Sequence, residues 1–550
     1  MKRTFLSLSF LFTVCIMASV SASSIATSLQ GISYYKAGFP MVAKPLLLEE
    51  LNSTPDNKAE VCFYLGNIYF GESKSDSAAI YFKKGLIANP LNSLNEVGLS
   101  MLKLKSNQLV ADQEIIATLK LKQNKANIDL LIAAGRAYLE NGLLDQALVY
   151  QAKAKKLKPK YAPVYVLLGD IELAKKNTGG ACSNYEMAIY FDDSNKEAYI
   201  KYARAYKVVN TQLAIAKLND LKKKDPSFLL ADRELGDIYY ATNDFKKSAE
   251  MYESYLKSGN SNVLDLTKYA TVLFFKGDNV KSLEVSKMGL SKAPRNPVFN
   301  RLSMYNNVAL NNFSEALLYA DLFFNKSEKS DVSYYDYTYY GQALRKTKQF
   351  DLAIQQFEKA LKVDSSQVGF MKEISDMYAE KRDTLKAITS YEKYMSLLPV
   401  EKVNADVLMT LGKLYMGYGN STSGATKKTA LLAADSIFSK VAALEPTNYI
   451  GNYYRAQANS AIDPETTLGL AKPYFEQTAK LLETKADVAR FNSVLVTCYS
   501  YLGIYYFKND NNSESKLYWN KVLAIDVNNS LAKKVLEGIN KPAKPIKAKK

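Results

Sequence analysis

Residues 59–92 read AEVCFYLGNIYFGESKSDSAAIYFKKGLIANPLN, and this stretch decides the fold because the rest of the chain repeats its pattern. Gly66 lies in one predicted helix, and Ala78 and Phe82 lie in a second helix after a short turn. Pro90 has no N–H to donate and disfavours the helical conformation at the preceding residue, so the second helix should end there. The spacing therefore predicts two antiparallel helices closed by a proline.

The residue types at these positions suggest how the two helices pack. We expect Gly66 to face Ala78 across the pair, because two small residues let the backbones approach closely. Tyr69 and Phe82 should then fill the space on either side.

The same order of a small residue, a second small residue and a closing proline recurs along the chain. The spacing stays between 33 and 37 residues until the last two intervals, which indicates a repeat protein. Fourteen units are predicted, with starts near Ser24, Ala59, Ser93, Ile128, Ala162, Lys196, Leu229, Val263, Pro297, Tyr334, Val368, Ala405, Tyr449 and Val496.

Four irregularities interrupt the repeat. The unit from Ser93 is the most degenerate, and Pro45 is expected to bend or shorten the second helix of the first unit. The segments 417–429 (GYGNSTSGATKKT) and 463–469 (DPETTLG) are expected to lengthen two turns. Residues 529–538 read as one more helix, which would cover the apolar face of the last unit.

The unit resembles the tetratricopeptide repeat. The resemblance rests on Leu65, Gly66, Tyr69, Ala78, Phe82, Gly85 and Pro90. It implies an all-α fold, a right-handed α-α superhelix of about fourteen helical hairpins, in which each unit buries its apolar face against its neighbours. In function, it implies a scaffold that holds a protein or peptide along the groove formed by the first helices.

The predicted domain organisation follows from where the repeat is regular. It comprises a signal peptide at 1–22, N-terminal repeats at 23–127 with the degenerate unit at 93–127, a regular array at 128–404, C-terminal repeats with inserted loops and a capping helix at 405–540, and a basic tail at 541–550.

The first 22 residues predict export. Lys2 and Arg3 precede an apolar run, and small residues around Ala22 are typical of signal cleavage; an uncleaved anchor is the alternative. We therefore expect a periplasmic protein, with association to the outer membrane as a further expectation. The lysine- and proline-rich tail 541–550 either contacts acidic envelope surfaces peripherally or is a solvated terminus.

Composition argues against most enzyme classes. The chain has no histidine and a formal charge of +17, and no glycine-rich phosphate loop or metal-ligand cluster is evident. Cys62, Cys182 and Cys498 fall on predicted helices and should be buried free thiols. We therefore predict no catalytic residue, no metal, no cofactor and no nucleic-acid partner.

The groove residues implied by the resemblance are charged or aromatic. Arginines in the central units could bind carboxylates or phosphates, although the alternative is a mixed, solvated face. The tyrosines after residue 333 could form a stacking platform, although core packing is the alternative. The candidates are Arg136, Arg204, Arg233, Arg301, Tyr305, Tyr335, Tyr339, Gln342 and Arg345.

Two functions remain open at this stage. The first is a non-enzymatic scaffold of the bacterial cell envelope that grips a partner protein or peptide. The alternative is a glycan- or nutrient-capture protein at the outer membrane.

Overall fold

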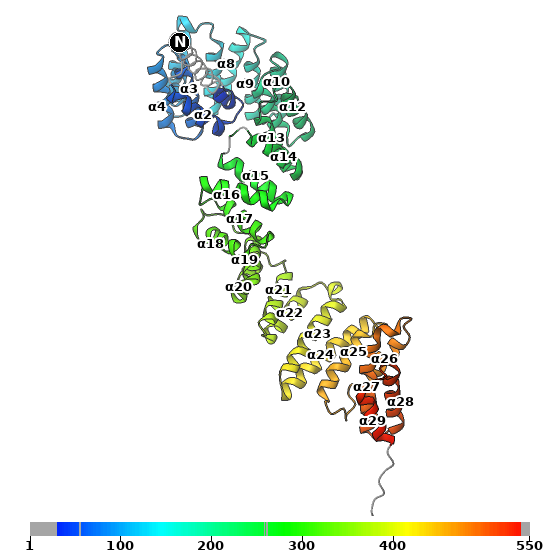
Figure 1. The fold of residues 1–550 in the computed structure, drawn as a ribbon. Helices are drawn as coiled ribbons and strands as arrows, with labels where there is room; N and C mark the ends of the chain where they lie inside the picture. The colour runs from blue at the N-terminus through cyan, green and yellow to red at the C-terminus, as the bar shows by residue number, and fades with distance from the viewer. Residues whose placement is uncertain (1–29, 54–56, 258, 260–261, 541–550) are drawn as a thin grey trace, which may run out of the picture. The chain divides into compact units, whose positions relative to one another are not determined.

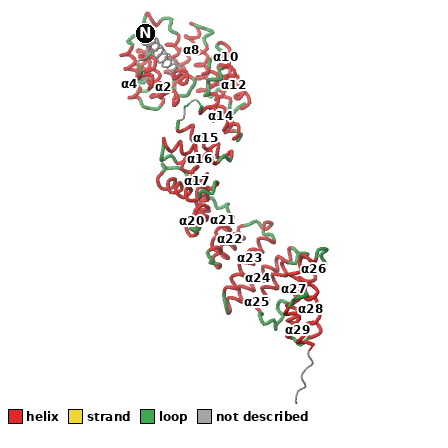
Figure 2. Tube along the Cα trace, in the orientation of Figure 1, coloured by secondary structure: helices red, strands yellow, loops and turns green. Residues whose placement is uncertain are grey.

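The computed structural model describes residues 30–53, 57–257, 259 and 262–540. These residues form two compact units, which divide between Asn306 and Asn307. The boundary falls inside helix α17 (Pro297–Ala309) (Figure 1). The predicted signal peptide, 1–22, and basic tail, 541–550, lie outside the described residues. Within the described part, every regular element is a helix and no helix is long and apolar enough to cross a membrane (Figure 2).

The first unit is a series of helical hairpins. Its first helices are residues 30–36, α3 (Lys58–Gly71), α5 (Ser93–Met101), α7 (Ile128–Glu140), α9 (Ala162–Ala174), α11 (Lys196–Tyr206), α13 (Leu230–Ala241), α15 (Val263–Lys276) and α17. Its second helices are α2 (Pro40–Asn52), α4 (Ser75–Ala88), α6 (Gln108–Lys120), α8 (Leu144–Leu157), α10 (Thr178–Phe191), α12 (Thr211–Lys224), α14 (Phe245–Leu256) and α16 (Asn279–Lys292).

The second unit continues the pattern and ends on a single helix. Its helices are α18 (Phe313–Asp321), extended by the π-helical turn Leu322–Lys326, α19 (Tyr334–Lys346), α20 (Phe350–Val363), α21 (Gly369–Glu380), α22 (Thr384–Leu397), α23 (Ala405–Ser421), α24 (Gly424–Leu444), α25 (Ile450–Ile462), α26 (Lys472–Glu483), α27 (Asn492–Lys508), α28 (Asn512–Ile525) and α29 (Ser530–Asn540). Helix α29 packs on α28, as expected of a cap.

The predicted fold class is confirmed. The described residues of the two units together contain fourteen hairpins, and within each unit the hairpins stack as a right-handed α-α superhelix. Most first helices begin within one residue of the predicted unit start. The largest deviation is α27, which begins at Asn492 rather than near Val496. The helix starts are strongly specified by caps: Asn127, for example, accepts a hydrogen bond from the N–H of Leu130.

The turn inside each hairpin has a common backbone. The second residue after the first helix usually has a positive φ. Most residues at this position are not glycine: the position is occupied by Gly38, Ser73, Gly142, Lys176, Asn243, Asn311, Lys348, Arg382 and Asp510. A left-handed residue lets the chain reverse in few residues, but it favours glycine. The hairpin turn is therefore built at a small cost in strain wherever the residue is not glycine.

The packing inside the hairpin differs from the expectation for Gly66. Ala78 is fully buried as predicted, but a Cβ placed on Gly66 would lie 2.3 Å from the Phe82 ring. Glycine therefore makes room for an aromatic ring of the second helix rather than for a second small residue.

One sequence expectation about irregular segments is wrong. The segment 417–429 does not lengthen a turn: α23 and α24 extend into it and leave only residues 422–423 between them. Gly419 is buried against Leu431, so tertiary packing overrides the low helix propensity of this segment. Helix α2 runs without interruption through Pro45, so it is not shortened. The turn at 463–469 is non-helical, as expected.

The three predicted thiols, Cys62, Cys182 and Cys498, are buried and free.

One side of the hairpin stack is formed by the first helices. In the first unit α3 contacts α5, α5 contacts α7, α7 contacts α9, and α9 and α13 both contact α11. No contact of similar extent joins successive second helices in the described residues. The first helices are therefore the closer-packed, concave side, which we call the inner face.

Candidate functional site

Ion pairs cover the inner face of the first unit around Arg136. Its two terminal nitrogens lie 3.0 Å from a carboxylate oxygen of Asp170 and 2.8 Å from one of Glu197. Lys201 pairs with both carboxylates, and the Tyr185 hydroxyl donates to Asp170 at 2.8 Å. These residues come from α7, α9, α10 and α11, so the network joins three consecutive hairpins.

A second network surrounds Arg204 and Arg233. Arg204 donates to both carboxylate oxygens of Glu234, at 3.1 and 2.7 Å. Arg233 donates to Asp265 at 2.7 Å and to Glu234 at 3.2 Å. The side chain of Asp265 is fully buried and also accepts from Tyr255, so Arg233 is held from several sides.

The pKa values reflect this pairing. Burial alone would raise the pKa of Asp170, but Lys201 and Arg136 outweigh it, so the pKa lies below its usual value. Burial would lower the pKa of Arg136, and the carboxylates of Glu197 and Asp170 raise it instead. The carboxylates of Asp265, Asp237 and Glu234 likewise raise the pKa of Arg233 against the effect of burial. The arginines are thus permanently charged and locally neutralised, so they do not form an unpaired basic stripe.

The chain's own N-terminal residues lie on this inner face. A terminal nitrogen of Arg204 donates to the Gly38 carbonyl at 3.0 Å, across a sequence separation of 166 residues. The guanidinium of Arg204 lies 4.5 Å from the centre of the Phe39 ring, and that of Arg233 lies 5.5 Å from it. Phe39 is only 3% exposed. Helix α2 begins directly after Phe39. Figure 1 shows this helix in the same part of the first unit as α9 to α13.

Two tyrosines extend this contact. The Tyr34 ring lies 5.8 Å from the Phe228 ring in an edge-on arrangement, and Tyr34 is 4% exposed. Tyr35 packs on Tyr64 with ring centres 5.2 Å apart. Burial raises the pKa of Tyr35, although Arg136 opposes the rise. We call residues 34–39 the N-terminal segment; it touches hairpins that are adjacent in sequence and hairpins far from it.

Arg301 and Tyr305 lie on α17. Arg301 is half-buried, and Tyr305 is buried, with its ring 5.6 Å from that of Phe274. The sequence assigned Tyr305 to the binding groove; the structure instead packs it into the core, because its ring turns toward the preceding hairpin.

The remaining candidates lie together on α19 in the second unit. Tyr335 and Gln342 are exposed, and Tyr339 is half-buried. Arg345 pairs with Glu373 and, at 2.6 Å, with Glu380 of α21. The α19 face therefore offers one exposed aromatic ring and one exposed amide beside a neutralised arginine.

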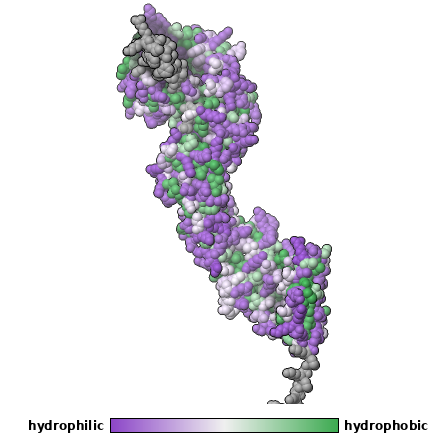
Figure 3. Space-filling model, in the orientation of Figure 1, coloured by the Kyte–Doolittle hydropathy of each residue, from purple (hydrophilic) through white to green (hydrophobic). Residues whose placement is uncertain are grey.

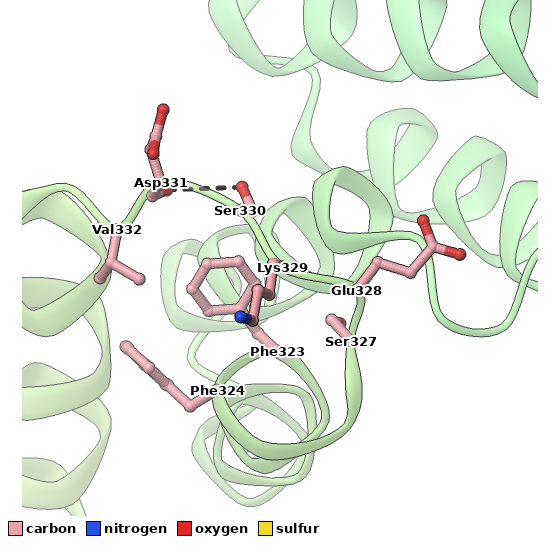
Figure 4. Close-up of a pocket in the computed structure, with 8 residues that line it drawn as sticks. All are labelled: Phe323, Phe324, Ser327, Glu328, Lys329, Ser330, Asp331 and Val332. Atoms are coloured by element: carbon pink, nitrogen blue, oxygen red, sulfur yellow. Dashed lines mark hydrogen bonds between the residues drawn. The ribbon is translucent and has the colours of Figure 1, made fainter.

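The segment before α19 forms a pocket that the sequence did not indicate. Its volume is about 660 Å³, and its lining comprises Phe323, Phe324, Ser327, Glu328, Lys329, Ser330, Asp331 and Val332. Figure 4 shows the two phenylalanines inside the bend of this segment and Glu328 pointing away from them. The signal in the sequence was the 37-residue spacing between Pro297 and Tyr334, longer than most intervals and without a closing proline.

The described residues contain no group of three or more acidic or cysteine side chains placed to hold a metal ion. Figure 3 shows hydrophilic residues over most of the visible surface of each unit, with apolar residues in small groups. The inner face of the first unit thus presents paired charges and buried aromatic rings.

A model of the family described as tetratricopeptide repeat matches residues 128–161 and 337–367. The TPR repeat-containing protein YpiA of Bacillus subtilis is 23% identical over 212 residues, which are 38% of this chain and 49% of that protein. This chain therefore spans about half the length of that relative. A TPR repeat-containing protein of Methanocaldococcus jannaschii is 22% identical and aligns with 67% of this chain and 74% of its own length.

Among solved structures, similarity is found to the C-terminal part of a TPR repeat-containing protein from Cytophaga hutchinsonii. The identity is 28%, the alignment covers 49% of this chain and 99% of that one, and the TM-score is 0.38.

Proposed function

Since the chain belongs to the tetratricopeptide repeat family, whose members commonly bind protein partners, we propose that it is a non-enzymatic scaffold that holds a protein or peptide on the inner face of its hairpins. We further propose that it works in the cell envelope, as an exported periplasmic protein associated with the outer membrane. The signal-like residues 1–22 support the location.

The observation that carries the binding role is that the inner face of the first unit already holds a polypeptide segment. A backbone carbonyl and an aromatic ring, at Gly38 and Phe39, are recognised there by arginine side chains. These groups occur in any protein, so the chemistry of the face suits a peptide. The fixed carboxylate partners of the arginines keep the guanidinium groups oriented, which lowers the entropy lost on binding.

The second unit offers a place to test this role. Gln342 is exposed on α19, a first helix, whereas Leu385 is exposed on α22, a second helix. A photo-crosslinking residue at position 342, in intact cells of the source organism, should capture one envelope protein in stoichiometric yield. The same residue at position 385 should not capture it. Equal capture at both positions, or no capture from either, would contradict a scaffold that uses its inner face.

Cell fractionation tests the location independently. We expect the chain in the periplasmic or outer-membrane fraction, shortened near Ala22, and a chain without residues 1–22 should stay in the cytoplasm. A full-length cytoplasmic chain would contradict the proposed location.

A further inference from the structure

We propose that the inner face at α11 and α13 is a binding site for a partner segment in which an aromatic residue follows a glycine turn, and that the N-terminal segment occupies this site as an internal ligand. The inference rests on the proposed scaffold function and names the chemistry of the partner. A partner would have to displace residues 34–39 to bind.

The contacts of the N-terminal segment resemble those of a ligand in three respects. They are long-range, because Arg204 and Gly38 are 166 residues apart. They involve one charged donor to a backbone carbonyl, which any peptide can supply. They also place one ring, Phe39, against two guanidinium groups, which is a specific way to recognise an aromatic residue.

The receiving side is preorganised without the segment. Glu234 and Asp265 hold the two guanidinium groups through bonds that do not involve residues 34–39. Phe228, which meets Tyr34, precedes α13 and belongs to the same hairpin as Arg233. The site would therefore keep its shape when the segment leaves.

The attachment of the first hairpin favours exchange. Helix α2 packs extensively on α3, its neighbour in sequence. The hydrogen bond to Arg204 and the ring contacts to Arg204 and Arg233 come instead from Gly38 and Phe39. The first hairpin is therefore held by two separate sets of contacts. The contacts of Gly38 and Phe39 with α11 and α13 can open while α2 stays packed on α3.

Gly38 provides a variant that opens this contact selectively. A Cβ on Gly38 would lie 2.5 Å from the terminal nitrogen of Arg204, so Gly38→Lys places a bulky cation where the guanidinium sits. The turn itself accepts lysine, since Lys176 and Lys348 occupy the same hairpin position with φ of 63° and 61°. Gly142→Lys is the matched control: Gly142 has a φ of 77° at the same position, and a Cβ there has no atom within 4 Å.

The experiment measures binding of a fluorescent peptide of residues 30–42, with acetylated and amidated ends, to the purified full-length chain. When a site is filled by the chain's own segment, an added peptide binds only the fraction of chains in which the site is open. The apparent affinity is therefore the intrinsic affinity multiplied by that fraction. The Gly38→Lys chain should therefore bind at least tenfold more tightly than wild type and Gly142→Lys. Adding Arg204→Met to Gly38→Lys should abolish the gain, and so should Phe39→Ala in the peptide.

Several outcomes would overturn the proposal. One is equal binding by Gly38→Lys and Gly142→Lys, or a gain that survives Arg204→Met. Another is loss of helical circular dichroism in Gly38→Lys but not in Gly142→Lys, which would show that the first unit does not stay folded when this contact opens. A Gly38→Lys dimer in light scattering would identify a second copy, rather than a partner, as the occupant. Crosslinking through Gln342 in the second unit does not depend on these results, so failure here and failure of the scaffold role are distinguishable.

Discussion

The ring of Phe82 on α4 lies in the space that a side chain at position 66 on α3 would fill, with a carbon of the ring 2.3 Å from the position of a Cβ on Gly66. The same relationship joins Gly169 to Tyr185, Gly236 to Tyr252, Gly412 to Phe438 and Gly503 to Trp519. The rings are fully buried, and the backbone of the first helix forms one wall of each ring's pocket. This glycine–aromatic pair is the repeated packing unit of the hairpin.

A methyl group at position 66 should destabilise the chain. Gly66→Ala forces the buried Phe82 ring or the backbone to shift, and overpacking of this kind costs about 1–3 kcal/mol. Gly71→Ala is a control in the same helix, because Gly71 is exposed and a Cβ there meets nothing within 4 Å. That variant should be neutral or stabilised by up to about 1 kcal/mol. Urea unfolding followed by circular dichroism measures both, and equal midpoints would contradict the packing account.

The hairpin turn offers the opposite change. Lys176 is exposed and has a φ of 63°, so Lys176→Gly should relieve strain and stabilise the chain by up to about 1 kcal/mol. The adjacent Lys175 has a φ of −76°, so Lys175→Gly brings no relief and should be destabilising. The difference in thermal midpoint between the two variants checks this. A lower midpoint for Lys176→Gly than for wild type would show that the turn is not strained there.

Much of the fold was predictable because the signal is local and repeated. The small residues and the closing proline specify where each hairpin begins and ends, and errors in one unit are corrected by the spacing of the others. The segment 417–429 misled this reading, since its glycines predict a loop when considered alone. Only the contact between Gly419 and Leu431, made after the two helices pack, shows why it is helical.

The candidate site was less predictable. The positions of Arg136, Arg204 and Arg233 on first helices follow from the periodicity, but their partners do not. The contact between Arg204 and Gly38 joins residues 166 positions apart, so no local pattern encodes it. The burial of Tyr305 is not encoded locally either, because it depends on how one hairpin leans on the next.

Thiol chemistry should report on the integrity of the core. Burial raises the pKa of Cys182 to about 11 and that of Cys498 to about 12, so little thiolate is present at pH 8. We expect no reaction of the native chain with Ellman's reagent within minutes at pH 8. In guanidinium chloride, all thiols of the purified chain should react. Rapid reaction of one thiol in the native chain would show that its hairpin opens locally.

Asp170 should make the free energy of unfolding depend on pH in the acidic range. Its pKa is lowered in the folded chain by Lys201 and Arg136, so its contribution is fully present above the unfolded value of about 3.9 and is lost as the pH falls through the folded value. At pH 7, Asp170→Asn should cost about 1–3 kcal/mol, because it removes the charge that both cations face. The difference from wild type should shrink below pH 4.

Asp193→Asn is the control: its ion pair with Lys224 is solvent-exposed, so little change is expected at pH 7. Urea midpoints for the three chains between pH 3 and pH 7 test this, and a constant difference between wild type and Asp170→Asn would show that the carboxylate acts through packing rather than charge.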